Sequence, residues 1–160
     1  MRMELIDGAD MPEPYRRLLV HVRDMTPTLE AFHRIKIELH PLQVQHDETF
    51  MLRQVILCDR DTNRPVEYGA IRINLSLFED EPRRLILETK HPLGGILRDY
   101  NIDHFGKPAG FFKVMSNSVI NEAFDLTESQ WLYGRCNRLF ADADNILAEV
   151  VEILPPADSN

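Results

Sequence analysis

This sequence of 160 residues contains neither a cluster of basic residues nor a long apolar run. Its longest apolar runs fall well short of the roughly 18 residues that span a membrane, and its first residues lack the charged and apolar regions of a signal peptide. The formal net charge is −8, and acidic clusters such as Glu79-Asp80-Glu81 stand beside basic pairs, so no cationic stripe is available for nucleic acid. We therefore expect a soluble cytoplasmic protein with neither a membrane nor nucleic acid as partner.

Cysteine is scarce, and the spacings typical of metal sites are absent. Cys58 and Cys136 each lie in an apolar, strand-like run, which indicates two buried thiols in a reducing compartment rather than a disulfide framework. His40 and His46 are too far apart along a strand to share an ion, and no HExxH or CxxC pattern accompanies them. We expect no metal site.

Glycine-rich phosphate loops and nucleophile motifs are missing as well. The segment HPLGG at residues 91–95 has neither the GxGxxG nor the GxxxxGK spacing, and no GxSxG elbow occurs. Nucleotides, hydride cofactors and acyl-enzyme chemistry are therefore not indicated, and we expect no cofactor.

What the sequence does contain is enough apolar surface for one core. Apolar residues make up 44% of the chain, and its length lies in the usual range of one domain. We expect a single domain over residues 1–160, with an ordered core from about 10 to 156 and a disordered ending in PPADSN.

The order of helices and strands indicates the fold class. Apolar residues at helical spacing predict helices over 12–25, 28–32 and 75–90, the last interrupted or restarted at Pro82, and Pro92 opens another. Strands are predicted where apolar residues alternate or form short β-rich runs: 35–40, 51–58, 66–75, 111–115, 131–141 and 146–154. Strands in runs with helices grouped between them indicate an α+β fold with an antiparallel sheet.

The strand EYGAIRINL, residues 67–75, contains an arginine in an otherwise strand-like run. Alternation places Ala70 and Arg72 on one face and Gly69 and Ile71 on the other. The face with Arg72 could simply be solvated. Alternatively, the Arg72 guanidinium holds the carboxylate of a ligand with two parallel N–H donors.

Two glutamates and one histidine are candidates for acid and base chemistry. Glu149 and Glu152 lie on opposite faces of the last strand, each with apolar neighbours. A carboxyl group on an apolar face tends to have a raised pKa, as a general acid near neutral pH requires, although an edge or salt-bridged glutamate shows the same pattern. His104 lies in a predicted loop, where it is either an acid/base group or merely exposed.

Four segments in order resemble the chorismate pyruvate-lyase superfamily, which includes the 4-hydroxybenzoate synthases. The segments are Asp24-Met25-Thr26, LRQVILC at 52–58, Pro92-Leu93-Gly94, and the closing pair LYGRCNRL with LAEVVEILPP. The resemblance extends from about Asp24 to Pro156. It implies a six-stranded antiparallel sheet with helices packed on it, a monomer, and an enclosed site for an aromatic or cyclohexadiene carboxylic acid.

The reaction implied by the resemblance is the elimination of pyruvate from chorismate to leave 4-hydroxybenzoate, without metal or organic cofactor. Such a reaction requires a cation for the ring carboxylate, an acid near the ether oxygen, and a pocket that excludes water. Glu152, four residues before Pro156, matches the family's glutamate, and Met25 matches a methionine that lines its pocket. Arg135 belongs to a matching Gly-Arg-x-x-Arg strand, where its role is either structural or catalytic.

Further substrate contacts are expected from Leu93, Gly94 and His104. Counted back from Phe78, the family's carboxylate-binding arginine falls on Ala70, and Arg72 lies two residues later. Because strand side chains repeat every two residues, Arg72 faces the same side roughly 7 Å further along. A long side chain or a small bulge would let Arg72 replace the missing cation.

Three hypotheses follow. The first is a cofactor-independent carbon–oxygen lyase that acts on chorismate or a related small cyclic acid, with Arg72 and Glu152 as catalytic residues. The second is a non-catalytic domain that binds a small aromatic acid on the same fold, as in the ligand-sensing domains of some transcription regulators. The third is another lyase, dehydratase or isomerase of secondary metabolism that uses His104 or Glu149 with Glu152.

Overall fold

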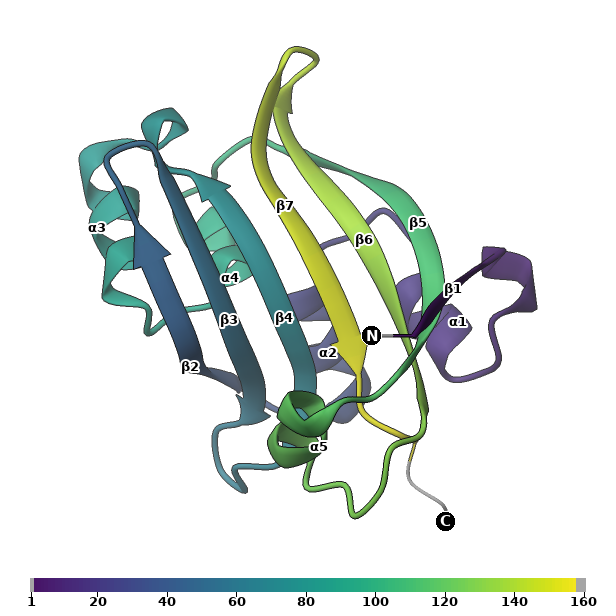
Figure 1. Cartoon of the computed structure of the whole chain (residues 1–160). Coiled ribbons are helices and arrows are strands. Elements are labelled where there is room, and N and C mark those ends of the chain that lie inside the picture. The colour runs from purple at the N-terminus through teal and green to yellow at the C-terminus, as the bar shows by residue number, and fades with distance from the viewer. Residues whose placement is uncertain (1, 158–160) are drawn as a thin grey trace.

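The framework of the protein is a seven-stranded sheet in the order β1-β5-β6-β7-β4-β3-β2, seen in a computed structural model that describes residues 2–157 (Figure 1). The strands are β1 (Met3–Ile6), β2 (Ile37–His46), β3 (Phe50–Asp59), β4 (Pro65–Asn74), β5 (Phe105–Met115), β6 (Trp131–Asp142) and β7 (Asn145–Leu154). All neighbouring strands in the sheet are antiparallel. The α+β class with an antiparallel sheet is confirmed.

The expected count of six strands is wrong by one, because β1 joins the edge of the sheet beside β5. Met3 and Leu5 of β1 are 56% and 78% exposed, and only Ile6 packs against an apolar cluster, so backbone hydrogen bonds contribute most to holding this strand. A strand that buries so little shows no apolar pattern in the sequence. Ordered structure therefore begins well before the expected boundary near residue 10.

The helices are short. They are α1 (Tyr15–Leu19), α2 (Met25–His33), α3 (Asp80–Glu88), α4 (Leu93–Asp99) and α5 (Ser118–Phe124), with 3₁₀ turns η1 (Gly8–Asp10) and η2 (Leu75–Leu77). The helix predicted over 12–25 is confined to α1, and the one predicted over 75–90 is split into η2 and α3. None of the helices in the described part of the chain is long and apolar enough to cross a membrane.

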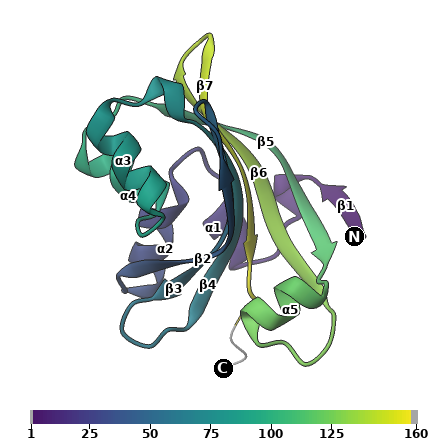
Figure 2. The same ribbon diagram turned by 60° about the vertical axis from the view of Figure 1, so that its left-hand side comes forward.

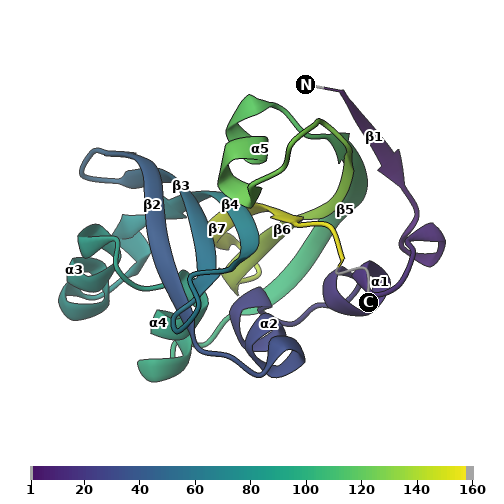
Figure 3. The same ribbon diagram turned by 90° about the horizontal axis from the view of Figure 1, so that it is seen from below.

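Helices cover both faces of the sheet unequally. Figures 2 and 3 show α1, α2, α3 and α4 on one face, which we call the inner face, and α5 on the other, the outer face. Two apolar clusters fill the space under the inner-face helices, one around Leu19 and Leu29 and one around Ile86 and Leu97. A third cluster packs α5 on the outer face through Phe124.

The strand register decides which side chains face the inner-face helices. Arg53 of β3, Ile71 of β4, Val150 of β7 and Asn137 of β6 are directly paired across four strands, so their side chains share the inner face. The next such row along the strands is Val55, Gly69, Glu152 and Arg135. These two rows form the floor beneath the starts of α2 and α4.

Candidate functional site

A cavity lies on these rows, between the inner face of the sheet and the starts of α2 and α4. Its empty volume is about 570 Å³, part of it open to solvent. Apolar side chains form most of its wall. The polar side chains that line it are Asp24, Thr26, Arg53, Glu67, Asn137 and Glu152. An apolar cavity with a few convergent polar groups is the usual form of a small-molecule site.

Arg53 is a buried cation in this cavity without an acidic partner. The residue is 3% exposed, and among the described residues no carboxylate lies within ion-pair distance of it. Its Nη1 and Nη2 donate to the carbonyl oxygens of Ile86 and His91 at 3.5 and 3.3 Å, whereas Nε has no partner there. Burial lowers the pKa of Arg53 to about 10, so the guanidinium still carries its charge at neutral pH.

Glu67 contributes a second unpartnered group to the same cavity. The residue is 4% exposed, and its Oε1 makes no hydrogen bond with any described residue. Burial raises the pKa of Glu67 well above its usual value, and the nearby Glu152 carboxylate raises it further, against the opposing effect of Arg135. These influences favour the protonated acid.

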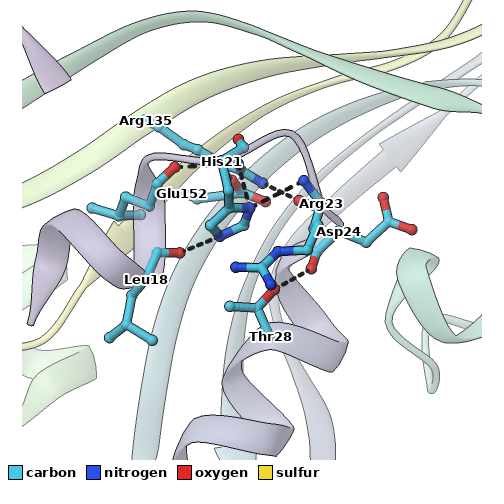
Figure 4. Close-up of polar contacts among 8 residues, drawn as sticks. Leu18, His21, Arg23, Asp24, Thr28, Arg135 and Glu152 are labelled. Carbon is cyan, nitrogen blue, oxygen red and sulfur yellow. Dashed lines mark hydrogen bonds and ion pairs between the residues drawn. The ribbon is translucent and has the colours of Figure 1, made fainter.

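Arg135 ties the segment between α1 and α2 to the sheet (Figure 4). The fully buried guanidinium donates from Nε to Glu152 Oε2 at 2.5 Å. Its Nη1 donates to the carbonyl oxygen of His21 at 2.8 Å, and its Nη2 donates to that of Arg23 at 3.0 Å. With so many donors already in use, Arg135 organises one wall of the cavity and does not line it.

Glu152 does line the cavity, but as the ionic partner of Arg135. Burial raises the pKa of Glu152, and the adjacent guanidinium offsets part of that shift. Glu152 is therefore less available as a free general acid than its place on an apolar face suggested.

His104 lies outside the cavity, behind its rim. Its Nε2 is 2.7 Å from the Asp24 carboxylate, and its Nδ1 is 2.8 Å from the carbonyl oxygen of Ile102. Both ring nitrogens face acceptors, so the protonated ring can donate to both. Burial lowers the pKa of His104, but these hydrogen bonds raise it more, so the pKa lies above its usual value. His104 thus holds Asp24, which lines the cavity, and does not reach the cavity itself.

The structure brings together some of the predicted site residues and separates others. Met25, Leu93, Gly94 and Glu152 all line the cavity. Whether they contact a ligand stays a prediction.

Arg72 and Ala70 lie on the outer face, on the far side of the sheet from Glu152. The Arg72 side chain is 48% exposed, 3.8 Å from the Glu149 carboxylate and stacked on the ring of Phe50. The register of β3 with β4 shifts only between Leu57 and Cys58, so no bulge turns Arg72 inward. The expectation that Arg72 and Glu152 share a pocket is wrong, and Glu149 lies outside the cavity for the same reason.

Three polar residues of the cavity were missed: Arg53, Glu67 and Asn137. Each has a buried polar atom without a hydrogen-bond partner among the described residues. The sequence pattern could have identified Arg53 as a buried charge, because the alternation from Met51 to Leu57 places this single charge among apolar side chains on one face. No group of three or more potential metal ligands occurs in residues 2–157.

No protein-family model and no curated protein matches this sequence. Solved structures do match. PhnF from Mycobacterium smegmatis aligns with 85% of this chain and 65% of its own at a TM-score of 0.61 and 6% identity. The ligand-binding domain of a regulator assigned to the GntR family, from Bordetella bronchiseptica, aligns over 78% of this chain and 92% of its own, at a TM-score of 0.54 and 12% identity.

A GntR-family transcriptional regulator from Enterococcus faecalis aligns over 72% of this chain and 91% of its own, with a TM-score of 0.51 and 10% identity. Identities this low establish a shared fold and not a shared function. Because these neighbours are named as regulators or their ligand-binding domains, they lend no support to lyase chemistry or to the exclusion of nucleic acid as partner. The chain has the chorismate lyase-like fold, which it shares with these neighbours.

Proposed function

We propose that this chain is a ligand-binding domain that takes a small organic anion into the inner-face cavity, with Arg53 as the group that holds the anion. The observation that carries the proposal is the buried, unpaired guanidinium of Arg53 in an otherwise largely apolar cavity. A buried charge is normally paired, because desolvation without a partner is costly. An anionic ligand supplies that partner.

The geometry of Arg53 favours a planar carboxylate. Two of its donors are fixed on the carbonyl oxygens of Ile86 and His91, which orients the guanidinium plane. Its Nε–H is unused, and the edge formed by Nε and a neighbouring Nη can donate two parallel hydrogen bonds to a carboxylate. The likeness to ligand-binding domains of the same fold supports a binding role.

Isothermal titration calorimetry with benzoate and methyl phosphate as probes tests this proposal. We expect Arg53→Met to weaken binding of the anion by about 2–5 kcal/mol, because it removes one partner of a buried charge pair. The matched control is Arg72→Met, an arginine on the outer face of the neighbouring strand, which should bind like the native protein. Absence of binding by either probe at millimolar concentration, or equal binding by Arg53→Met, would contradict the proposal.

A chorismate lyase is the second candidate function, and one observation favours it. Glu152 lies in the cavity with a raised pKa, where a general acid for ether cleavage would be required. Its ion pair with Arg135 favours the binding role instead. Incubation of concentrated protein with chorismate, followed by assay of pyruvate and 4-hydroxybenzoate, decides between the two functions. We expect neither product to form. Formation of both products by the native protein, but not by Glu152→Gln, would establish the lyase.

A further inference from the structure

Glu67 has no role in the binding of an anion by Arg53, yet it occupies the same cavity. It is buried, and its Oε1 has no hydrogen-bond partner among residues 2–157. Leaving a buried polar group unsatisfied destabilises a fold, so an apolar residue would serve folding better at this position. The glutamate is therefore better explained by a ligand than by the protein interior.

The Glu67 carboxyl group lies beside the neighbouring glycine on the cavity floor. Gly69 follows Glu67 on the inner face of β4, and a Cβ at Gly69 would lie 3.6 Å from Glu67 Oε2. Gly69 is directly paired with Glu152 on the next strand. The carboxyl group of Glu67 thus extends along β4 toward Gly69 and Glu152, and both glutamates border one space.

The charges around Glu67 leave only one cation unbalanced. Glu152 of β7 is paired with Arg135 of β6, and Asp24 before α2 is paired with His104. Arg53 of β3 is the remaining charged group of the cavity wall, and no carboxylate of the described chain pairs with it. With Glu67 neutral and His104 protonated, the cavity has one net positive charge and suits a monoanion.

We propose that Glu67 is a specificity-determining residue that donates its O–H to a neutral oxygen of the ligand, so that the preferred ligand is a small monoanion carrying a hydroxyl group distant from its anionic group. The inference rests on the proposed function, because the anion must be held by Arg53. Four residues of β4, about 13 Å of strand, separate Glu67 from Ile71, which is paired with Arg53. The two side chains therefore meet opposite ends of one small molecule.

An ammonium group in place of the hydroxyl would require ionised Glu67. Burial and the Glu152 carboxylate both oppose that ionisation. A neutral hydroxyl, by contrast, accepts a hydrogen bond from the protonated acid without adding a charge to a desolvated site. The structure therefore favours the hydroxylated monoanion over a zwitterion.

The test compares benzoate, 4-hydroxybenzoate and 4-(aminomethyl)benzoate by calorimetry on the native protein, Glu67→Gln and Glu67→Leu. We expect the hydroxyl to tighten binding about two- to tenfold in the native protein, the worth of one added hydrogen bond. Glu67→Gln keeps a neutral donor and should keep this gain, whereas Glu67→Leu should lose it. Benzoate, which lacks the hydroxyl, is the reference in each protein, so the gain is the ratio of the dissociation constants of benzoate and 4-hydroxybenzoate within one protein.

The pH dependence provides an independent measurement on the same proteins. The affinity gained from the hydroxyl should change in the native protein as the pH rises and Glu67 ionises, because the ligand's O–H then becomes the donor and the Glu67 carboxylate the acceptor. In Glu67→Gln this gain should not change with pH. If benzoate binds through Arg53 but the hydroxyl gives no gain, this inference is overturned and the proposed function stands. Tighter binding of 4-(aminomethyl)benzoate that is lost in Glu67→Gln also overturns it. Failure of every benzoate to bind would overturn the proposed function itself.

Discussion

Two buried arginines on the inner face have opposite relations to their surroundings. Arg135 is neutralised by Glu152 and donates to backbone carbonyl oxygens of the segment between α1 and α2. Arg53 has no such partner and opens onto the cavity. A paired buried arginine specifies structure, whereas an unpaired one indicates a site for an anion.

Arg135→Met should therefore affect folding before it affects binding. It leaves the Glu152 carboxylate buried without its cation and the carbonyl oxygens of His21 and Arg23 without their donor. We expect a loss of about 3–5 kcal/mol in the free energy of unfolding, measured by urea denaturation.

Two further variants show whether the unpaired charge of Glu152 causes the loss of stability in Arg135→Met. Arg135→Met combined with Glu152→Leu removes the orphaned charge and should recover part of the loss. Arg138→Met removes a half-exposed arginine from the outer face of the same strand and should change stability little. If Arg138→Met lost as much free energy of unfolding as Arg135→Met, the structural role assigned to Arg135 would be contradicted.

The sequence predicted the alternation of side chains on the strands but not which face the helices would cover. Ala70 and Arg72 do share a face, as the period of two requires, and Glu67, Gly69 and Ile71 share the other. Both faces of this strand carry a polar residue, so the pattern alone could not identify the inner one. That choice depends on how α2 and α4 pack, which is a property of the whole chain.

At the scale of elements, an ion pair joins the starts of α2 and β5. Asp24, which precedes α2, binds His104, which precedes β5, and the Asp24 carbonyl oxygen accepts a hydrogen bond from Thr28 in α2. A Cβ at Gly106 would lie only 2.7 Å from the carbonyl oxygen of Val22, so the backbones approach closely here. These contacts fix the rim of the cavity.

The His104 contact should make the stability of this rim depend on pH. Burial lowers the pKa of His104, but hydrogen bonds to Ile102 and Asp24 raise it more, so the folded-state pKa lies above the usual value. The stabilisation is then fully present below the unfolded-state pKa of about 6.5 and is lost as the pH rises through the folded-state pKa.

Chemical denaturation of His104→Gln measures this dependence. We expect the variant to lose more free energy of unfolding relative to the native protein at about pH 5.5 than at about pH 8.5. His46→Gln, at an exposed position at the end of β2, serves as control. The same loss at both pH values would show that protonation of His104 does not stabilise the rim.

Part of β5 and the helix α5 were not predicted from the sequence, for local reasons. The first half of β5 contains Gly106, Pro108 and Gly110, which interrupt the alternation, and the register shifts between Pro108 and Gly110. The helix α5 has few residues to form a periodic pattern, although the side chain of Asn117 caps its start. Long strands with regular alternation, such as β3 and β7, were predicted within about one residue of their ends.

At the scale of the whole molecule, the fold places a binding cavity where a fully apolar interior would be more stable. Arg53, Glu67 and Asn137 keep buried polar atoms unsatisfied in this one region. Proteins often retain such destabilising groups where function requires them. The single domain and the monomer expected from the sequence stay predictions beside this proposal.

Glu67→Leu should therefore stabilise the protein while it removes the preference for a hydroxylated ligand. The folded-state pKa of Glu67 is raised, so the folded protein retains this proton to a higher pH than the unfolded chain does. Consequently, Glu67 costs stability as the pH rises above the unfolded-state pKa of about 4.3. We expect Glu67→Leu to increase the free energy of unfolding by about 1–3 kcal/mol near neutral pH and by less in acid. Chemical denaturation across this pH range should show a gain in stability for Glu67→Leu that grows with pH. Glu122→Leu, at an exposed position of α5, serves as control. A loss of stability in Glu67→Leu would mean instead that Glu67 supports the fold.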